Sequence, residues 1–220
     1  MYHYVEDKDF LKRAQNTCSN LMSELEKGLR ERGINSQFFL VGSGARNMVT
    51  QNEKEPIDFD YNLNILSCND FNDCKSIKEL VRKTFNKVLR NNNLSDCDDS
   101  TSSLTTKSIC FKDDDSISFS IDVCIVALDT EGIWNRLKHE KGSNSYYDKY
   151  YWNKAPNSNG YNEKAKAIKL VPGWWEEVRK HYLDIKNNYL KRSDHNHPSF
   201  ICYIQAINDV YNEMKQNNLL

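Results

Sequence analysis

The sequence has no surplus of charge of either sign. Its 30 lysine and arginine residues are nearly balanced by 31 aspartate and glutamate residues, which leaves a net charge of −1. A protein without an extended positive field is not expected to bind long nucleic acid through its phosphates, although a local basic patch is compatible with this balance.

The sequence also lacks a long apolar run. No stretch approaches the roughly 20 consecutive apolar residues that a membrane-spanning helix requires. Residues 1–7 have neither the basic nor the apolar segment of a signal peptide. The seven cysteines are odd in number and follow no disulfide framework, which is typical of a reducing compartment. We therefore expect a cytoplasmic protein with no membrane partner.

Histidine is scarce. The five histidines are too scattered to suggest a catalytic triad. His195 and His197 stand close together, but Pro198 follows them, and we interpret this segment as a polar loop before a helix rather than as a metal site. His139 and His181 lie in charged stretches that read as helices, where we expect them to be exposed.

An apolar run that ends in a glycine-rich turn is the first informative feature. Residues 38–41 are aromatic or branched, and Gly42, Ser43 and Gly44 end the run, which predicts a buried strand and a tight turn. The next residues predict the start of a helix, with Ser43 as its N-cap. Free N–H groups at a helix start attract phosphate, and Arg46 could add a charged contact.

Two aspartates follow this turn after a short polar stretch. Residues 58–66 alternate polar with apolar side chains, which predicts a strand with Asp58, Asp60, Asn62 and Asn64 on one face. Two carboxylates at this spacing repel each other unless a cation lies between them. Hard oxygen ligands of this kind favour Mg²⁺ or Mn²⁺.

A third aspartate lies inside the strongest predicted strand. Residues 116–128 alternate at first and then become continuously apolar around Asp122. A charge inside such a run is costly without a partner, so it indicates a site. The preceding residues 107–111 complete a predicted hairpin that could bring Asp122 alongside the strand with the other two aspartates.

These residues together resemble the nucleotidyltransferase superfamily that includes DNA polymerase beta. Its signature is Gly-Ser, a spacer, Asp-x-Asp and a later Asp on a neighbouring strand, and the matching residues here are Gly42, Ser43, Asp58, Asp60 and Asp122. Each piece alone is weak, but the ordered set in its strand and turn context is moderately specific.

The resemblance implies a mechanism. A hydroxyl attacks the alpha phosphate of a nucleoside triphosphate, pyrophosphate leaves, and two Mg²⁺ or Mn²⁺ ions about 3.5–4 Å apart stabilise the attacking and leaving oxygens. In this reading Asp58 and Asp60 are ligands of both ions. Asp122 then serves the ion that activates the acceptor hydroxyl, and could also receive its proton.

The resemblance covers roughly residues 35–130 and implies an α+β fold, a mixed β-sheet flanked by helices. It further implies that Gly42, Ser43 and Gly44 bind the beta and gamma phosphates, with Arg46 beside them. For Arg46, a surface position on a helix is the alternative explanation.

Structural explanations remain open for each feature. The glycine turn could be only a link between a strand and a helix, and Asp58 and Asp60 could form the solvated face of an edge strand. Asp122 could be the partner of a capped turn. A further alternative retains the fold without the chemistry, as a nucleotide-binding regulatory or scaffold module, although the presence of all three carboxylates argues against it.

The rest of the first half is predicted to be helix and loop. Apolar residues at helical spacing predict helices over residues 9–32 and 72–91. Residues 91–106 are polar with almost nothing to bury, which predicts a mobile loop. Its acidic side chains are expected to be solvated rather than metal-bound. These are Asp96, Asp98 and Asp99.

The character of the chain changes near residue 130, where we expect a domain boundary. Residues 131–139 are predicted to be a short helix and residues 142–160 an aromatic loop. The aromatic side chains of this loop are expected to pack against the catalytic domain, with stacking on a base as the alternative. They are Tyr146, Tyr147, Tyr150, Tyr151 and Trp152.

Three further helices are predicted over residues 162–170, 172–192 and 198–215, where prolines and periodic apolar residues give start signals. They are expected to form a small bundle. Lysines of the first could reach the triphosphate, although a solvated face is the default. These are Lys164, Lys166 and Lys169.

The sequence therefore predicts a nucleotidyltransferase domain over residues 1–130 and a helical domain with an aromatic linker over residues 131–220. The expected activity transfers a nucleoside monophosphate, AMP from ATP, to an acceptor hydroxyl. The acceptor stays open among a second nucleotide, a small-molecule alcohol, a protein side chain and an RNA end. A long nucleic acid is disfavoured by the charge balance.

Overall fold

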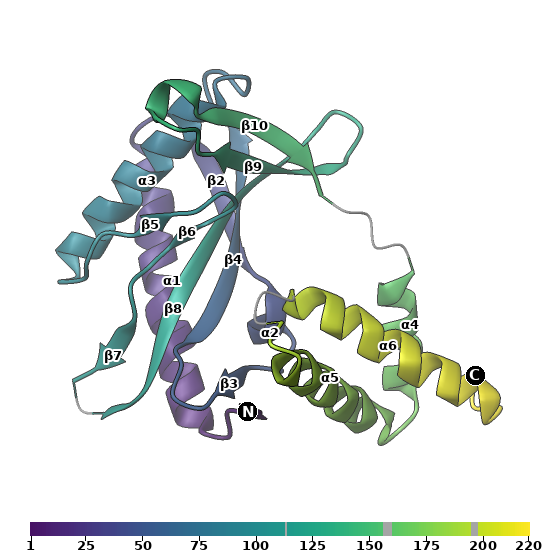
Figure 1. Ribbon diagram of the computed structural model, residues 1–220. Coiled ribbons are helices and arrows are strands. Elements are labelled where there is room, and N and C mark those ends of the chain that lie inside the picture. Colours follow the sequence, from purple (N-terminus) through teal and green to yellow (C-terminus); the bar gives the residue numbers. More distant parts are fainter. Residues whose placement is uncertain (113, 156–159, 195–197) are drawn as a thin grey trace. The chain divides into compact units, whose positions relative to one another are not determined.

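The computed structural model describes residues 1–112, 114–155, 160–194 and 198–220 (Figure 1). The chain divides into two compact units. The larger unit comprises Glu6–Val49 and Glu55–Ala155. The smaller unit comprises Met1–Val5, Thr50–Lys54 and Pro156–Leu220.

The larger unit is a mixed sheet with helices. Its central strands follow the order β10-β9-β8-β4-β2, in which β4 and β8 are parallel and the other neighbours are antiparallel. The elements are α1 (Lys8–Arg30), β2 (Asn35–Leu40), α2 (Gly42–Ala45), β4 (Ile57–Ser67), α3 (Cys74–Asn91), β5 (Asp98–Asp99), β6 (Leu104–Thr105), β7 (Ile109–Phe111), β8 (Asp114–Leu128), β9 (Trp134–Glu140), the 3-10 helix η1 (Ser145–Tyr147) and β10 (Lys149–Lys154). This architecture confirms the predicted α+β class.

The long strand β8 organises the sheet. It pairs with β4 along one edge, while β7, β6 and β9 pair in turn with its other edge, and β5 pairs with β6. The pairing of β7 with the start of β8 confirms the predicted hairpin. Figure 1 shows β4 and β8 running side by side through the middle of the larger unit.

The alternation along strand β4 gives this part of the sheet one buried apolar face and one more exposed polar face. Phe59, Tyr61 and Leu63 are buried, whereas Asp58 is exposed and Asp60 is half-buried. The helices α1 and α3 contact each other and lie on one side of the sheet in Figure 1. The period-2 pattern of β4 and the helical spacing of α1 and α3 are therefore read correctly from the sequence.

The predicted helix over residues 131–139 is wrong, and so is the loop assignment of residues 149–154. Both segments are antiparallel strands, β9 and β10, at the end of the sheet. In β9, Asn135, Leu137 and His139 are buried, and the residues between them are more exposed. Two of these three buried side chains are polar, so the period-2 pattern is hidden from a reading of apolar residues. The sheet thus continues beyond residue 130, and the larger unit extends to Ala155.

The prediction of a mobile loop over residues 91–106 is also wrong. This segment contains β5 and β6, and it buries Cys97, Leu104 and Thr106. The expectation that Asp99 is solvated fails too, because Asp99 forms an ion pair with Lys78 and a hydrogen bond with a histidine of β9. The segment is ordered by partners that lie far away in the sequence.

The smaller unit combines three helices with a two-stranded sheet. Its elements are β1 (Tyr2–Tyr4), β3 (Thr50–Asn52), α4 (Tyr161–Leu170), α5 (Trp174–Lys191) and α6 (Ser199–Gln216). The three helices confirm the predicted bundle, and α5 and α6 both contact α4. The predicted polar loop at His195 and His197 lies outside the described residues.

The strands of the smaller unit come from the first half of the chain. The β1 backbone is held by Asn187 of α5, whose amide accepts from Tyr2 N at 2.8 Å and donates to Tyr2 O at 3.1 Å. The Tyr4 hydroxyl donates to the carbonyl of Arg179 at 2.7 Å. Nothing in the periodicity of the sequence indicates this return of the N-terminus to the helices.

Among the helices of the described ranges, none combines the length and the apolar character that crossing a membrane requires.

Candidate functional site

The parallel pair β4 and β8 brings the three predicted aspartates together. Asp60 lies opposite Asp122, and Asp58 lies opposite Ser120. Residues paired across neighbouring strands share a face of the sheet, so all three carboxylates project from the same face. The predicted adjacency of Asp122 to the other two aspartates is therefore confirmed.

Two hydroxyl groups hold two of these carboxylates. The Ser120 hydroxyl donates to Asp58 Oδ1, and the Thr105 hydroxyl donates to Asp122 Oδ1. The alternation of β8 gave a signal for Ser120, because it stands two residues before Asp122 and must share its face. Thr105 comes from the polar segment before β7, and no pattern in the sequence pointed to it.

Asp60 has an unfavourable environment for a negative charge. Burial raises its pKa to about 6, and the neighbouring carboxylates of Asp122 and Asp58 contribute to this rise. Arg136 of β9 and Arg46 act in the opposite direction. Arg136 was not predicted, because its strand was read as a helix. Burial and the neighbouring carboxylates together therefore outweigh the two arginines, and Asp60 ionises less readily than an ordinary aspartate.

The glycine turn lies directly against Asp60. The backbone N–H of Val41 donates to the Asp60 carbonyl at 2.8 Å. Gly42 has a φ of +64°, and a Cβ at this position would lie 2.2 Å from Asp60 Oδ2. Only glycine fits, because any side chain would be strained by the left-handed backbone and would overlap the carboxylate.

The helix after the turn begins earlier than predicted and is shorter. It is the single turn α2, its N-cap is Val41, and no side chain caps it. Ser43 is therefore inside the turn and is not the N-cap, which corrects that part of the prediction. Gly44 is buried, and a Cβ there would lie 3.2 Å from side-chain carbons of both Leu40 and Phe59.

Arg46 turns back toward the glycine turn. Its Nη1 donates to the carbonyl of Gly42 at 2.7 Å, and its charge acts on Asp60. The guanidinium group therefore belongs to the same cluster as the aspartates, and its exact contact with any phosphate stays a prediction.

The donor chemistry of the three aspartates fits a divalent cation. Among the described residues, no three His, Cys, Asp or Glu side chains form a ready-made metal-ligating group. Asp58 and Asp122 instead accept hydrogen bonds from Ser120 and Thr105. Carboxylate oxygens nevertheless suit Mg²⁺ or Mn²⁺, and a cation would relieve the repulsion that raises the pKa of Asp60.

The aromatic residues of β10 pack inside the larger unit. The ring of Tyr150 stacks on His139 with centroids 4.1 Å apart, and the indole N–H of Trp152 donates to Phe71 O at 2.7 Å. The predicted packing role is confirmed for these two. Tyr146 has 87% of its surface exposed and contacts Tyr147 edge to face.

The lysines of α4 have partners within the smaller unit. Lys164 Nζ donates to Asn208 Oδ1 at 2.6 Å, and Lys169 Nζ lies 4.2 Å from the centre of the Trp175 ring. Lys166 is exposed. The default expectation of a solvated face is met by Lys166, whereas Lys164 and Lys169 contact side chains of the same unit.

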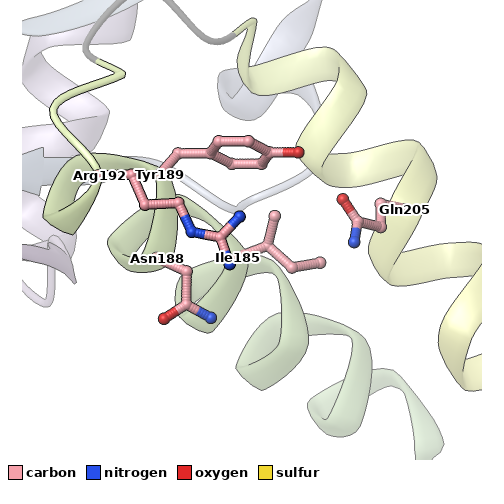
Figure 2. Close-up of a pocket in the computed structure, with 5 residues that line it drawn as sticks. All are labelled: Ile185, Asn188, Tyr189, Arg192 and Gln205. Carbon is pink, nitrogen blue, oxygen red and sulfur yellow. The ribbon is translucent and has the colours of Figure 1, made fainter.

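A shallow pocket of about 100 Å³ lies between α5 and α6. Figure 2 shows the Arg192 guanidinium group beneath the ring of Tyr189, with Gln205 facing them from α6. The pocket has no acidic residue among those that line it, so it offers none of the metal-ligating chemistry of the sheet.

Solved structures share this fold at low sequence identity. CdnC from E. coli MS115-1, solved with ATP, matches with a TM-score of 0.53 and 12% identity over 92% of this chain and 61% of its own. The CdnC:HORMA-deltaN complex matches at 0.53 and 14% identity, over 92% of this chain and 60% of that one. Vibrio cholerae DncV cyclic AMP-GMP synthase aligns at 0.46 and 14% identity, over 70% of this chain and 40% of its own.

No family model matches the sequence, and no curated protein matches it. The chain spans about three fifths of the length of the CdnC chains. The structural match with CdnC concerns the fold alone, and it is consistent with the mixed sheet described above. This chain therefore shares its fold with CdnC.

Proposed function

We propose that this chain is a metal-dependent nucleotidyltransferase that moves a nucleoside monophosphate from a nucleoside triphosphate to an acceptor hydroxyl. The observation that carries the proposal is the register of the parallel strands, in which Asp60 lies opposite Asp122 while Asp58 shares their face. Three clustered carboxylates, one with a raised pKa, are typical of a site that holds a cation during catalysis.

The aspartates would hold Mg²⁺ or Mn²⁺, which when bound supplies positive charge to stabilise the attacking and leaving oxygens. Asp58 and Asp60 would contribute oxygens at one end of strand β4. Asp122 would hold the acceptor hydroxyl in position and accept its proton. The rise in the pKa of Asp60 supports this arrangement, because burial and the neighbouring carboxylates both disfavour its negative charge, and a bound cation would favour it.

The glycine turn would receive the triphosphate. Gly42 has no side chain between the turn and Asp60, so a phosphate could approach the backbone closely. The N–H groups of Gly42, Ser43 and Gly44 are the expected donors, and Arg46 would add positive charge. Its present contact with the Gly42 carbonyl supports a place beside the turn.

We propose ATP as the donor, in line with the ATP bound in the CdnC structure. A second nucleotide, a small molecule or a protein hydroxyl could be the acceptor. The balanced net charge disfavours a long nucleic acid. The seven cysteines are all free thiols, which agrees with a reducing compartment such as the cytoplasm.

The test incubates the purified chain with each of the four nucleoside triphosphates, singly and mixed, with Mg²⁺ or Mn²⁺, and resolves products by mass spectrometry. Asp60→Asn and Asp122→Asn are expected to abolish product. Asp96→Asn is the matched control, because Asp96 is an exposed carboxylate of the same unit that pairs with Arg90. Product that persists in Asp60→Asn and Asp122→Asn would overturn the assignment of the site.

The same experiment separates the enzyme from a nucleotide-binding module. A silent module would bind a triphosphate with metal-dependent affinity and release neither pyrophosphate nor a new nucleotide product. A chain with no metal-dependent nucleotide affinity would exclude both functions.

A further inference from the structure

We propose that Asp99 is a positioning residue for Asp122. Held by buried Lys78 and His139, it fixes the β5–β6 hairpin, which presents the Thr105 hydroxyl to the Asp122 carboxylate. The inference rests on the proposed function in one respect only, the catalytic role of Asp122.

A cluster of charged side chains is buried on the face of the sheet opposite the three aspartates. Lys78 of α3 has 1% of its surface exposed, and its Nζ lies 2.8 Å from Asp99 Oδ1 and 2.8 Å from the carbonyl of Ser100. His139 of β9 has 4% exposed. Its Nδ1 lies 2.7 Å from Asp99 Oδ2, and its Nε2 lies 3.0 Å from Asp148 Oδ2.

The members of the cluster depend on one another. Burial lowers the pKa of Lys78, and the hydrogen bond to Asp99 opposes that fall. The hydrogen bonds from the Gly142 N–H and from His139 lower the pKa of Asp148. A buried charge that loses its partner is strongly unfavourable. Asp99 therefore cannot leave Lys78 without a large penalty, and its position is fixed.

Asp99 lies in the hairpin that reaches the site. In the β5–β6 pair, Asp99 lies opposite Leu104 and Asp98 lies opposite Thr105. The turn is closed by Ser100, whose N–H donates to the carbonyl of Ser103 at 3.0 Å. On its other edge, β6 pairs with β8 and sets Thr105 opposite Asp122.

The hairpin is short, and it is held by β8 on one side and by the contacts around Asp99 on the other. Each strand is two residues long, and an isolated two-stranded hairpin is at best marginally stable in water. The backbone is tied further at the same place, because Lys141 Nζ donates to Asp99 O at 2.6 Å and His139 N donates to Thr101 O at 2.8 Å.

The end of this chain of contacts is the Asp122 carboxylate. The Thr105 hydroxyl donates to Asp122 Oδ1 and so restricts rotation of that carboxylate. A hairpin released from Lys78 and His139 would leave the Thr105 hydroxyl poorly placed. The catalytic carboxylate would then sample more orientations, which lowers turnover more than it changes substrate binding.

Asp98 provides a matched control within the same strand. It is an exposed neighbour of Asp99, and its partner is the exposed Lys107. Asp99→Asn and Asp98→Asn make the same chemical change at adjacent residues. Only the first removes the negative charge that lies against the buried Lys78.

The primary readout is amide hydrogen exchange of residues 104–106 in the full chain, which does not depend on activity. Asp99→Asn is expected to accelerate this exchange about 10- to 100-fold, the equivalent of one lost hydrogen bond to a charged group, with Asp98→Asn unchanged. Equal exchange in the two variants would overturn the proposal, whether or not the chain proves to be an enzyme.

The second readout is a double-variant cycle on turnover. Thr105→Val alone is expected to reduce kcat with little change in KM, and Thr105→Ser is expected to restore it. Adding Asp99→Asn to Thr105→Val should cause almost no further loss, because both act through the same hydroxyl. Independent, multiplicative losses would show that Asp99 has a general structural role and would overturn the proposal.

A pair of His139 variants keeps the proposal testable if Asp99→Asn does not fold. The amide of His139→Asn can donate to Asp99 from the place of Nδ1, whereas that of His139→Gln can donate to Asp148 from the place of Nε2. We expect slow exchange at residues 104–106 in His139→Asn and fast exchange in His139→Gln. The opposite order would contradict the inference.

Discussion

Asp60 of β4 and Asp122 of β8 lie directly opposite each other in a parallel strand pair. The parallel register places both carboxylates on one face. Burial of Asp60 and the nearby charge of Asp122 both raise the pKa of Asp60. The adjacency is a property of strand pairing, so it does not require long side chains or a flexible loop. A rigid sheet is a suitable support for a site that must hold ligands accurately.

The stability of the metal-free protein should depend on the protonation of Asp60. Its pKa is about 6 in the folded chain against 3.8 ordinarily. The folded state therefore binds more protons between these values, and stability from this group falls as the pH rises from about 4 to about 6. Asp60→Asn should remove the loss, so the variant should exceed wild type by about 1–3 kcal/mol at pH 8 and match it near pH 4.

Urea unfolding of both proteins across this pH range, without divalent cation, measures the difference directly. The difference between the two proteins cancels the titration of groups that do not interact with Asp60. A difference that does not vary with pH would contradict the raised pKa of Asp60.

Gly42→Ala should damage the site more than an equivalent change elsewhere. The new Cβ would lie 2.2 Å from Asp60 Oδ2 on a backbone with φ of +64°. Gly132→Ala is the control, because Gly132 has a φ of +74° and no heavy atom within 4 Å of its Cβ position. Both should lose about 1 kcal/mol to backbone strain.

Only Gly42→Ala should also lose metal-dependent nucleotide binding, as measured by calorimetry with ATP and Mg²⁺. Equal affinity in the two variants would separate the glycine turn from the nucleotide site.

The sequence predicted the central strands because their chemistry follows their geometry. In β4 the alternation of acidic and apolar residues matches the two faces of the sheet, and Asp122 stands inside an apolar strand, where a charge is costly without a partner. The relation of Asp122 to Asp60 needed only that the two strands be neighbours. The candidate site was therefore largely readable in advance.

The rest depended on contacts between distant parts of the chain. His139 is polar yet buried because Asp99 and Asp148 bind both of its ring nitrogens, so its strand resembled a charged helix. Thr105 reaches Asp122 from a segment with no periodic pattern. Partners of this kind cannot be inferred from local spacing, because the two residues lie far apart in the sequence and no pattern around either one indicates the contact.

Asn187→Ala should destabilise the smaller unit. The Asn187 side chain makes two hydrogen bonds with the backbone of Tyr2, and their loss should cost about 1–3 kcal/mol because a buried amide and backbone groups lose partners. Asn188→Ala changes the next residue, which is exposed, and should have little effect.

Hydrogen exchange should show the loss of protection in β1 and α5 for Asn187→Ala, while α1 of the larger unit keeps its protection. Uniform loss across both units would contradict a local role for this contact.

The most direct test of the central claim is pyrophosphate release from ATP in the presence of Mg²⁺, compared among wild type, Asp122→Asn and the control Asp96→Asn. The account predicts release by wild type and by Asp96→Asn, and a loss of at least about a hundredfold in Asp122→Asn. Equal release by Asp122→Asn and wild type would contradict the assignment of catalysis to the paired aspartates of β4 and β8.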